Sequence, residues 1–346
     1  MKAVVKTRKA TGCIELQELA IPTPASDEVL AKVYAAGVCG TDLGIYRDKP
    51  GQIYYPPVVL GHEFSGTIVE LGKNVSGWKV GDEVVAEPQT KACGICPYCR
   101  QGEIGMCPKK RSPGWGTNGA MAEYIALPAK LLHRIPARVG LEKAALTEPL
   151  AIAVHAMTEN TSVQVGDVVA VLGAGPIGIL AALTALQCGA GSVAIAGITS
   201  DEVYRLPAAK RMGIPVVVNI EKEDINGLVM NLTEGMGADM VIDACGAETA
   251  INQGITLLRK KGRLVAIGIS PDRVSLDWNL AVAKNVSFHF QYSSTYTSWE
   301  RSLKMLACEK SPFEEVISCT YRLEEWEEAF ARSERCEVLK VLLCPP

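Results

Sequence analysis

The sequence predicts an α/β protein in which a mostly β region is combined with a doubly wound parallel sheet. Residues 1 to about 150 are rich in glycine, proline and short valine or isoleucine runs, which favours closely spaced strands and turns. From about Val168 onwards apolar strands alternate with longer helical stretches, as they do in βαβ units. The chain has 346 residues, a length typical of about two domains.

The expected elements follow from apolar runs of strand length between turn residues. In the first part the strands are expected at residues 1–6, 29–33, 66–72 and 81–86, and a strand is expected to end at 58–60. In the second part they are expected at 168–172, 193–196, 216–219, 240–243, 263–267 and 286–290. A helix over 298–308 and a final strand over 338–343 complete the chain.

Charge and hydropathy exclude several classes of partner. The net charge of −3 is unfavourable for binding nucleic acid or an anionic membrane. No apolar run reaches the roughly 18 residues of a membrane span, and the N-terminus lacks the apolar segment of a signal peptide. We therefore expect a cytoplasmic protein that acts on a small molecule.

A histidine and a carboxylate stand side by side in the run from Gly61 to Gly66, as His62 and Glu63. Upstream, Cys39 precedes Gly40, Thr41 and Asp42. A thiolate, an imidazole and a carboxylate suit a zinc ion, and three protein ligands with one open position are typical of a catalytic site. The alternative is a histidine–glutamate pair at a strand end and an unrelated buried thiol.

Four cysteines follow at the short spacing C-x2-C-x2-C-x7-C. Four thiolates so close together can enclose one zinc ion, and a closed shell leaves no position for chemistry. Disulfides are the competing interpretation, which the missing secretory signal disfavours. The sequence thus predicts a structural zinc held by Cys93, Cys96, Cys99 and Cys107.

The expected strand 168–172 runs into a G-x-G-x-x-G turn and then an apolar helix. Gly173 permits the tight turn, Gly175 allows a pyrophosphate to approach the backbone, and Gly178 allows close packing of helix and strand. The helix N-terminus then faces the phosphates. This context predicts a dinucleotide site rather than the glycine turn of an ordinary βα unit.

The acidic residue that would hold the adenosine ribose is missing where the second strand ends at Gly197. Thr199, Ser200 and Arg205 offer groups for a 2′-phosphate, but Asp201 is near enough to replace the missing acid, so NAD and NADP both remain open. The cofactor-binding residues expected here are Gly173, Gly175, Pro176, Ile177, Gly178, Gly197, Thr199, Ser200, Arg205 and Ile267.

The run Gly61-His62-Glu63-x-x-Gly66-x5-Gly72-x-x-Val75 resembles the zinc signature of the medium-chain alcohol and polyol dehydrogenases. The four cysteines, the glycine turn and the closing strand appear in that family's order, so the resemblance covers essentially the whole chain. It implies a GroES-like catalytic domain of residues 1–153 and 291–346 with a Rossmann domain, 154–290, inserted. It also implies a homotetramer and an active site in the cleft between the domains.

The run from Leu146 to Ala151 places Glu148 where the best-known alcohol dehydrogenases carry a cysteine ligand. This is similar to the sorbitol and threonine dehydrogenase branch, which implies that Cys39, His62 and Glu63 bind the catalytic zinc and that Glu148 binds it directly or through water. The alternative for Glu148 is a helix N-cap before Pro149.

Two positions depart from the family pattern. Gly44 stands where a histidine helps to pass the alcohol proton to solvent, and Gln291 stands where the polyol branch often has arginine. Thr41 is still expected to take part in removing the proton. Three aromatic residues are candidates for the substrate cleft, although packing is the better explanation for each one taken alone: Tyr46, Trp115 and Tyr292.

The expected function is hydride transfer between a secondary alcohol, a polyol or sugar alcohol, and NAD or NADP, with one catalytic and one structural zinc. Three alternatives remain open. An L-threonine 3-dehydrogenase shares the metal set, although its branch usually has Asp-Pro-Phe-Gly where this chain has Glu148-Pro149-Leu150-Ala151. The others are a zinc-free reductase of the same fold and a nucleotide-binding protein without turnover.

Overall fold

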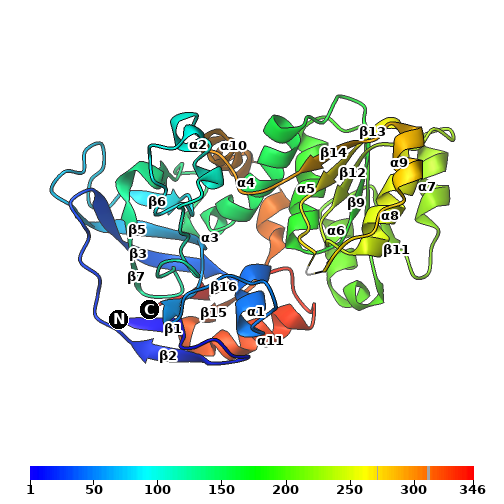
Figure 1. The fold of residues 1–346 in the computed structure, drawn as a ribbon. Helices are drawn as coiled ribbons and strands as arrows, with labels where there is room; N and C mark the ends of the chain where they lie inside the picture. The colour runs from blue at the N-terminus through cyan, green and yellow to red at the C-terminus, as the bar shows by residue number, and fades with distance from the viewer. Residues whose placement is uncertain (271, 310–311) are drawn as a thin grey trace.

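The computed structural model describes residues 1–346 except 271 and 310–311. The chain forms two lobes, and both termini lie in the lobe that is built mainly from β-strands (Figure 1). The second lobe contains a six-stranded sheet with helices around it (Figure 1). This arrangement confirms the fold class that the sequence predicts.

The six-stranded sheet has the order β11-β10-β9-β12-β13-β14, and every neighbouring pair is parallel. The chain starts in the middle of the sheet, moves to one edge and then returns to fill the other side. Ligands bind where this direction reverses, beyond the carboxyl ends of the central strands. The strands are β9 (Val168–Leu172), β10 (Ser192–Gly197), β11 (Val216–Asn219), β12 (Ala238–Asp243), β13 (Leu258–Ala266) and β14 (Ser287–Phe290).

Both faces of this sheet are buried because helices cover them. In β9, Val169 and Val171 belong to one hydrophobic cluster, while Ala170 and Leu172 belong to another. This alternation follows from the pleat, which points successive side chains to opposite faces. The helices of this lobe are α5 (Pro176–Gln187), α6 (Arg205–Arg211), α7 (Ile225–Leu232), α8 (Glu248–Leu257) and α9 (Trp278–Lys284).

The β lobe is closed by the C-terminal strand, because β16 pairs antiparallel with β3. Its larger sheet has the order β15-β16-β3-β5-β6-β8, with β7 also paired to β3, and a smaller sheet has the order β2-β1-β4. The strands are β1 (Lys2–Lys6), β2 (Ile14–Glu18), β3 (Glu28–Gly37), β4 (Val58–Val59), β5 (Glu63–Leu71), β6 (Glu83–Ala86), β7 (Tyr124–Pro128), β8 (Leu132–Arg134), β15 (Ile317–Arg322) and β16 (Lys340–Cys344).

The remaining helices border the sheets of the β lobe or connect the two lobes. Helix α4 packs against α10 and also against α5 of the other lobe. Its side chains share one hydrophobic cluster with β9 and α5, so a continuous core joins the lobes. These helices are α1 (Gly40–Tyr46), α2 (Pro97–Arg100), α3 (Leu141–Ala144), α4 (Thr147–His155), α10 (Tyr296–Leu306) and α11 (Trp326–Glu334).

The expected elements are present with shifted ends. Strands β9 and β11 have the expected bounds, whereas β3 and β13 are longer than expected and α10 begins two residues earlier. The domain limits remain a prediction, and the limit at residue 153 falls inside α4. Among the described residues, no helix combines the length and the apolar character needed to span a bilayer.

Candidate active site and metal centres

His62 and Glu63 are placed by a sharp turn at the start of β5. Gly61 has φ +89°, and a Cβ there would lie 2.7 Å from the Met121 side chain, so only glycine fits this turn. The Gly61 N–H donates to Asp42 Oδ1 at 3.2 Å. The turn delivers two adjacent polar side chains into the interior, where His62 is 4% exposed and Glu63 is 1% exposed.

Cys39 directly precedes helix α1, and its N–H donates to Asp42 Oδ2 at 2.9 Å. The buried carboxylate of Asp42 therefore fixes both Cys39 and the turn at Gly61. Burial raises the pKa of Asp42, and the charge of His62 and these two N–H bonds oppose that rise. The analysis of the sequence missed this role, although an acid three residues after a cap position is a known capping signal.

The three expected ligands converge although they come from distant segments. Cys39, His62 and Glu63 each offer one ligand atom, and these atoms all lie within 4.8 Å of one another. His62 Nδ1 is buried without a hydrogen-bond partner in the described part of the chain. An unpaired buried nitrogen is costly, and a metal ion would satisfy it. The sulfur, nitrogen and oxygen donors fit zinc.

Negative charge surrounds the imidazole of His62. Burial alone lowers the pKa of His62, but the Cys39 sulfur, through its charge and a hydrogen bond, and the carboxylates of Asp42 and Glu148 raise it to about 10. The site therefore favours a positive charge at the imidazole when no metal is bound. The same charges would attract a divalent cation.

Glu63 forms a buried ion pair that the sequence analysis did not predict. Lys340 Nζ, at the start of β16, donates to Glu63 Oε2 at 2.6 Å and to the Val38 carbonyl at 3.0 Å. The two charged side chains are 3% and 1% exposed. Gly37 lies opposite Glu63 in the β3–β5 pair, and a Cβ on Gly37 would collide with the Glu63 carboxylate.

Glu148 lies close to the metal ligands but outside the group of three. It is the second residue of α4, whose N-cap is Leu146 and which has no side-chain cap. The N-cap alternative is therefore wrong. Burial and the charge of Glu63 raise the pKa of Glu148 to about 7, while His62 and Lys340 oppose the rise. The Glu148 carboxyl group is therefore close enough to interact electrostatically with His62, Glu63 and Lys340.

Thr41 lies beside the thiol ligand, because the Cys39 Sγ–H donates to Thr41 Oγ1 at 3.9 Å. The space left by Gly44 is filled from another segment: a Cβ on Gly44 would lie 3.2 Å from Gln52 Oε1. The amide of Gln52 thus stands next to the place of the missing histidine. An amide can order a water molecule, but it cannot itself carry the proton at neutral pH.

The three candidate cleft residues have different surroundings. The Trp115 ring packs edge-on against His62, with the ring centres 4.8 Å apart. Tyr292 is 58% exposed on the segment between β14 and α10. Tyr46 instead packs against Phe330 of α11, so packing explains it. Buried Gln291 accepts or donates a hydrogen bond at His155 Nδ1.

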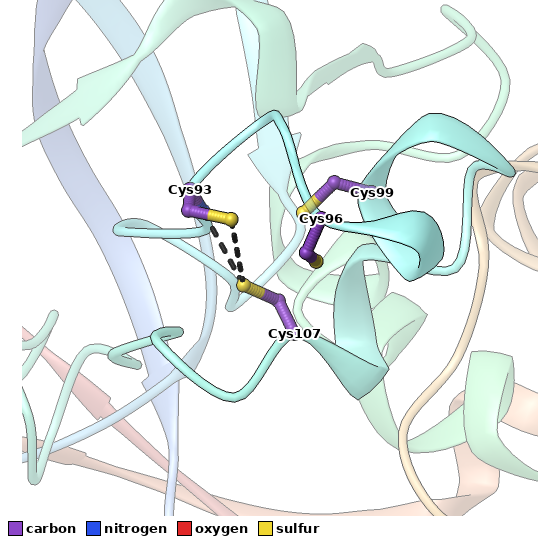
Figure 2. Close-up of side chains that lie close together, drawn as sticks. All are labelled: Cys93, Cys96, Cys99 and Cys107. Carbon is purple, nitrogen blue, oxygen red and sulfur yellow. Dashed lines mark hydrogen bonds between the residues drawn. The ribbon is translucent and has the colours of Figure 1, made fainter.

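The four clustered cysteines form a second group of ligand atoms within 4.8 Å of one another. Figure 2 shows their sulfurs gathered between a loop and two short helical turns, with Cys107 joined by dashed lines to Cys93. All four are free thiols, and the Cys107 and Cys93 sulfurs are 3.6 Å apart, too far for a disulfide. Backbone N–H groups of Ile95 and Cys96 lower the pKa of Cys93 to about 6, which favours the thiolate that zinc binds.

The glycine turn after β9 has the geometry of a dinucleotide site. Gly173 has φ +113°, and a Cβ on Gly178 would collide with the Gly173 carbonyl. A Cβ on Gly175 would meet nothing within 4 Å, so this face is open to a ligand. Pro176 begins α5, followed by Ile177. Ile267 follows β13 at the same end of the parallel strands, with its N–H bonded to the Asp243 carbonyl at 2.9 Å.

The end of β10 is organised differently from the sequence-based expectation. Asp201 is buried and accepts from the Ile198 N–H at 3.0 Å, so its carboxylate is already engaged. Arg205 is paired with Asp201 and with the Val338 carbonyl, each at 3.2 Å. The Thr199 N–H donates to Glu221 at 2.9 Å, so an acid from the segment after β11 lies here. Gly197 ends β10, and Ser200 follows Thr199.

Comparison with known proteins agrees with this geometry. Residues 25–137 match the alcohol dehydrogenase GroES-like domain family, and residues 176–308 match the zinc-binding dehydrogenase family. The chain is 40% identical to a sorbitol dehydrogenase of Halalkalibacterium halodurans (100% of this chain, 99% of the relative) and 36% identical to a D-arabitol-phosphate dehydrogenase of Enterococcus avium (99% and 97%).

A solved structure from Sinorhizobium meliloti 1021, assigned to the zinc-binding dehydrogenases and bound to NADP, superposes with a TM-score of 0.90. It is 27% identical in sequence, and the superposition covers 99% of each chain. Zinc and a nicotinamide dinucleotide are the cofactors of this class of enzyme. The chain therefore belongs to the zinc-dependent medium-chain dehydrogenases, in the branch of the polyol and threonine dehydrogenases, and is an NAD(P)-dependent alcohol dehydrogenase.

Proposed function

We propose that the protein oxidises a secondary hydroxyl of a polyol or sugar alcohol to a ketone and transfers the hydride to NAD(P). The observation that carries this proposal is the convergence of the Cys39, His62 and Glu63 ligand atoms within 4.8 Å. The sorbitol and arabitol-phosphate dehydrogenases among the relatives support a polyol substrate.

The alcohol loses two hydrogen atoms in the reaction: the one on oxygen leaves as a proton, and the one on carbon leaves as a hydride. A zinc ion held by Cys39, His62 and Glu63 would act as a Lewis acid and lower the pKa of the substrate hydroxyl. A nicotinamide dinucleotide held at the glycine turn after β9 would supply the hydride acceptor, so that the substrate carbon is oxidised to the ketone. The Thr41 hydroxyl, beside Cys39, accepts the hydroxyl proton and passes it to water, which the Gln52 amide orders near Gly44.

Glu148 and Lys340 adjust the charge around the ligands. The ammonium of Lys340 balances Glu63, while Glu148 adds a further carboxylate whose charge acts on His62. We propose that Glu148 reaches the zinc directly or through one water. Because its pKa is raised to about 7, the Glu148 carboxyl can hold or release a proton near neutral pH.

Oxidation of L-threonine at its secondary hydroxyl is the second candidate, because an L-threonine 3-dehydrogenase of Bacillus subtilis is 37% identical over 100% of this chain. The Glu148-Pro149-Leu150-Ala151 segment favours the polyol. Sorbitol, xylitol, inositol and threonine should be assayed side by side with NAD and with NADP. Threonine-dependent reduction without any polyol-dependent reduction would replace the polyol assignment.

The metal role is tested on the same sample. Cys39→Ser is expected to lose both the alcohol-dependent reduction of NAD(P) and about one zinc equivalent per chain. Cys308→Ser, an exposed thiol in another segment, is the matched control and should retain both. A Cys39→Ser enzyme with full activity and zinc content would contradict the assignment, and nucleotide binding without turnover in the unmodified protein would leave a binding protein.

We also propose a homotetramer, which the family resemblance implies, and a cytoplasmic location, where clustered zinc-binding thiols stay reduced. Light scattering coupled to size-exclusion chromatography measures the first. Cell fractionation measures the second.

A further inference from the structure

Two cations follow the four-cysteine loop and are held over aromatic rings. Lys110 is half-buried, and its Nζ lies 4.5 Å from the ring centre of Tyr292. The guanidinium of Arg111 lies 5.2 Å from the ring centre of Tyr55. Within residues 1–270, 272–309 and 312–346, neither cation has a carboxylate partner at ion-pair distance. Both cations are therefore available to an external anion.

This pair is attached to the metal site by short contacts. The Tyr55 N–H donates to the Trp115 carbonyl at 2.9 Å, and the Trp115 ring packs on the ligand His62. The Arg111 carbonyl accepts from Thr90 Oγ1 at 3.0 Å, which fixes the backbone that carries both cations. Tyr55 is thus bonded through its backbone to Trp115, whose ring contacts a residue of the candidate metal site.

The ammonium of Lys110 lies within electrostatic range of one residue of the candidate site, Glu148. Burial lowers the pKa of Lys110, and the charges of Cys107 and Glu148 oppose this effect. The ammonium therefore interacts electrostatically with the carboxylate of Glu148 without forming an ion pair with it. A partly buried and unpaired ammonium is unfavourable, and an anionic ligand group would remove part of that cost.

We propose that Lys110 and Arg111 bind an anionic group of the substrate, so that the polyol is a sugar-alcohol phosphate or a sugar acid rather than a neutral polyol. The inference rests on the proposed function and specifies its substrate class. An ammonium and a guanidinium form charge-assisted hydrogen bonds with phosphate and carboxylate oxygens. Tyr292 and Tyr55 hold the two cations in place through cation–π contacts.

The test uses the full-length zinc-loaded protein with sorbitol, sorbitol 6-phosphate and gluconate. We expect kcat/KM for one of the two anionic substrates to exceed that for sorbitol by at least about tenfold. Lys110→Gln should lower the anionic-to-neutral ratio about tenfold, mainly through KM, and Lys110→Arg should recover most of it. Lys109→Gln, an exposed neighbour, is the matched control and should leave the ratio unchanged. Zinc content and melting temperature establish that each variant is folded.

Ionic strength provides a second measurement that needs no variant. Raising the salt from about 0.05 M to about 0.5 M should raise KM for the anionic substrate more than for sorbitol. A preference for sorbitol 6-phosphate identifies phosphate as the bound group, and a preference for gluconate identifies carboxylate. Oxidation of sorbitol as efficient as that of both anionic substrates overturns this inference but not the proposed function. Failure to oxidise any alcohol of either class overturns both.

Discussion

Replacing Lys340 by methionine tests the buried ion pair at the candidate zinc site. Methionine has a similar length but no charge, so Glu63 would keep its carboxylate in a place where it is 1% exposed. The substitution removes the 2.6 Å bond to Glu63 and the 3.0 Å bond to the Val38 carbonyl. No other lysine or arginine in the described residues pairs with Glu63.

Removing one partner of a buried pair costs about 3–5 kcal/mol, because the remaining charge is desolvated without compensation. For a chain of this size that cost corresponds to a melting temperature lower by about 4–7 °C. A zinc ion at Glu63 would offset part of the loss, so the decrease in melting temperature of the zinc-loaded protein should be near the lower end of this range. In a Glu63→Gln background the charge is absent, and Lys340→Met should be close to neutral.

The assay is thermal unfolding of four proteins: wild type, Lys340→Met, Glu63→Gln and the double variant. Lys2→Met is the matched control, because Lys2 pairs with Glu324 at the surface, where the side chains are 41% and 32% exposed. It should melt like the wild type. Equal melting temperatures for Lys340→Met and Lys2→Met would refute the reasoning. So would an equal cost of Lys340→Met in both backgrounds, since coupling requires them to differ.

Three further predictions concern the metals. Gly37→Ala should displace the Glu63 carboxylate and lower the zinc content. Gly40→Ala, whose added Cβ meets nothing within 4 Å, should retain the zinc. Equal zinc content in the two variants would argue against the close packing of Glu63 on Gly37. Cys96→Ser should lose the structural zinc and make the 93–107 loop sensitive to protease, because the loop has little core of its own. The control Cys308→Ser should retain the zinc and the protease resistance. A protease-resistant Cys96→Ser would contradict a structural metal. Burial lowers the pKa of His62, but the neighbouring negative charges raise it to about 10, so zinc must displace protons from its ligands and its affinity at this site should rise with pH through the neutral range; a competition titration with a chromophoric chelator measures it, and a flat profile would contradict a protonated His62.

The parallel sheet was largely predictable because its strands are apolar on both faces. Strand β9 is a continuous run of apolar residues that ends at Gly173, and β11 is a run of valines that ends at Asn219. Strand β15 was missed for the converse reason. Its sequence Ile-Ser-Cys-Thr-Tyr-Arg has few apolar residues, and it lies at the edge of its sheet, where one side needs no apolar cover.

The convergence of Cys39, His62 and Glu63 was predictable from their residue types and the family resemblance, whereas the groups that support them were not. By themselves, His62 and Glu63 between two glycines also fit an ordinary strand end, and it is the resemblance of the longer run to the zinc signature that predicts a metal site. Asp42 and Glu221 act through backbone N–H groups of segments that meet only in the folded chain. A carboxylate that binds a backbone N–H has no characteristic partner residue in the sequence, so its role is visible only in the structure.

The ion pair between Lys340 and Glu63 depends on the register of the strands that carry the two residues. A lysine between Leu339 and Val341, in an otherwise apolar strand, requires a partner if it is buried, but any acid would satisfy that requirement. The partner is fixed by two pairings: Gly37 lies opposite Glu63 on one side and opposite Leu342 on the other. Since Gly37 has no side chain, the Glu63 carboxylate extends across it to a lysine 277 positions away. A shift of one residue in either pairing would turn Lys340 or Glu63 to the other face of the sheet, so the charge balance of the zinc site depends on the closure of the sheet by the C-terminal strand.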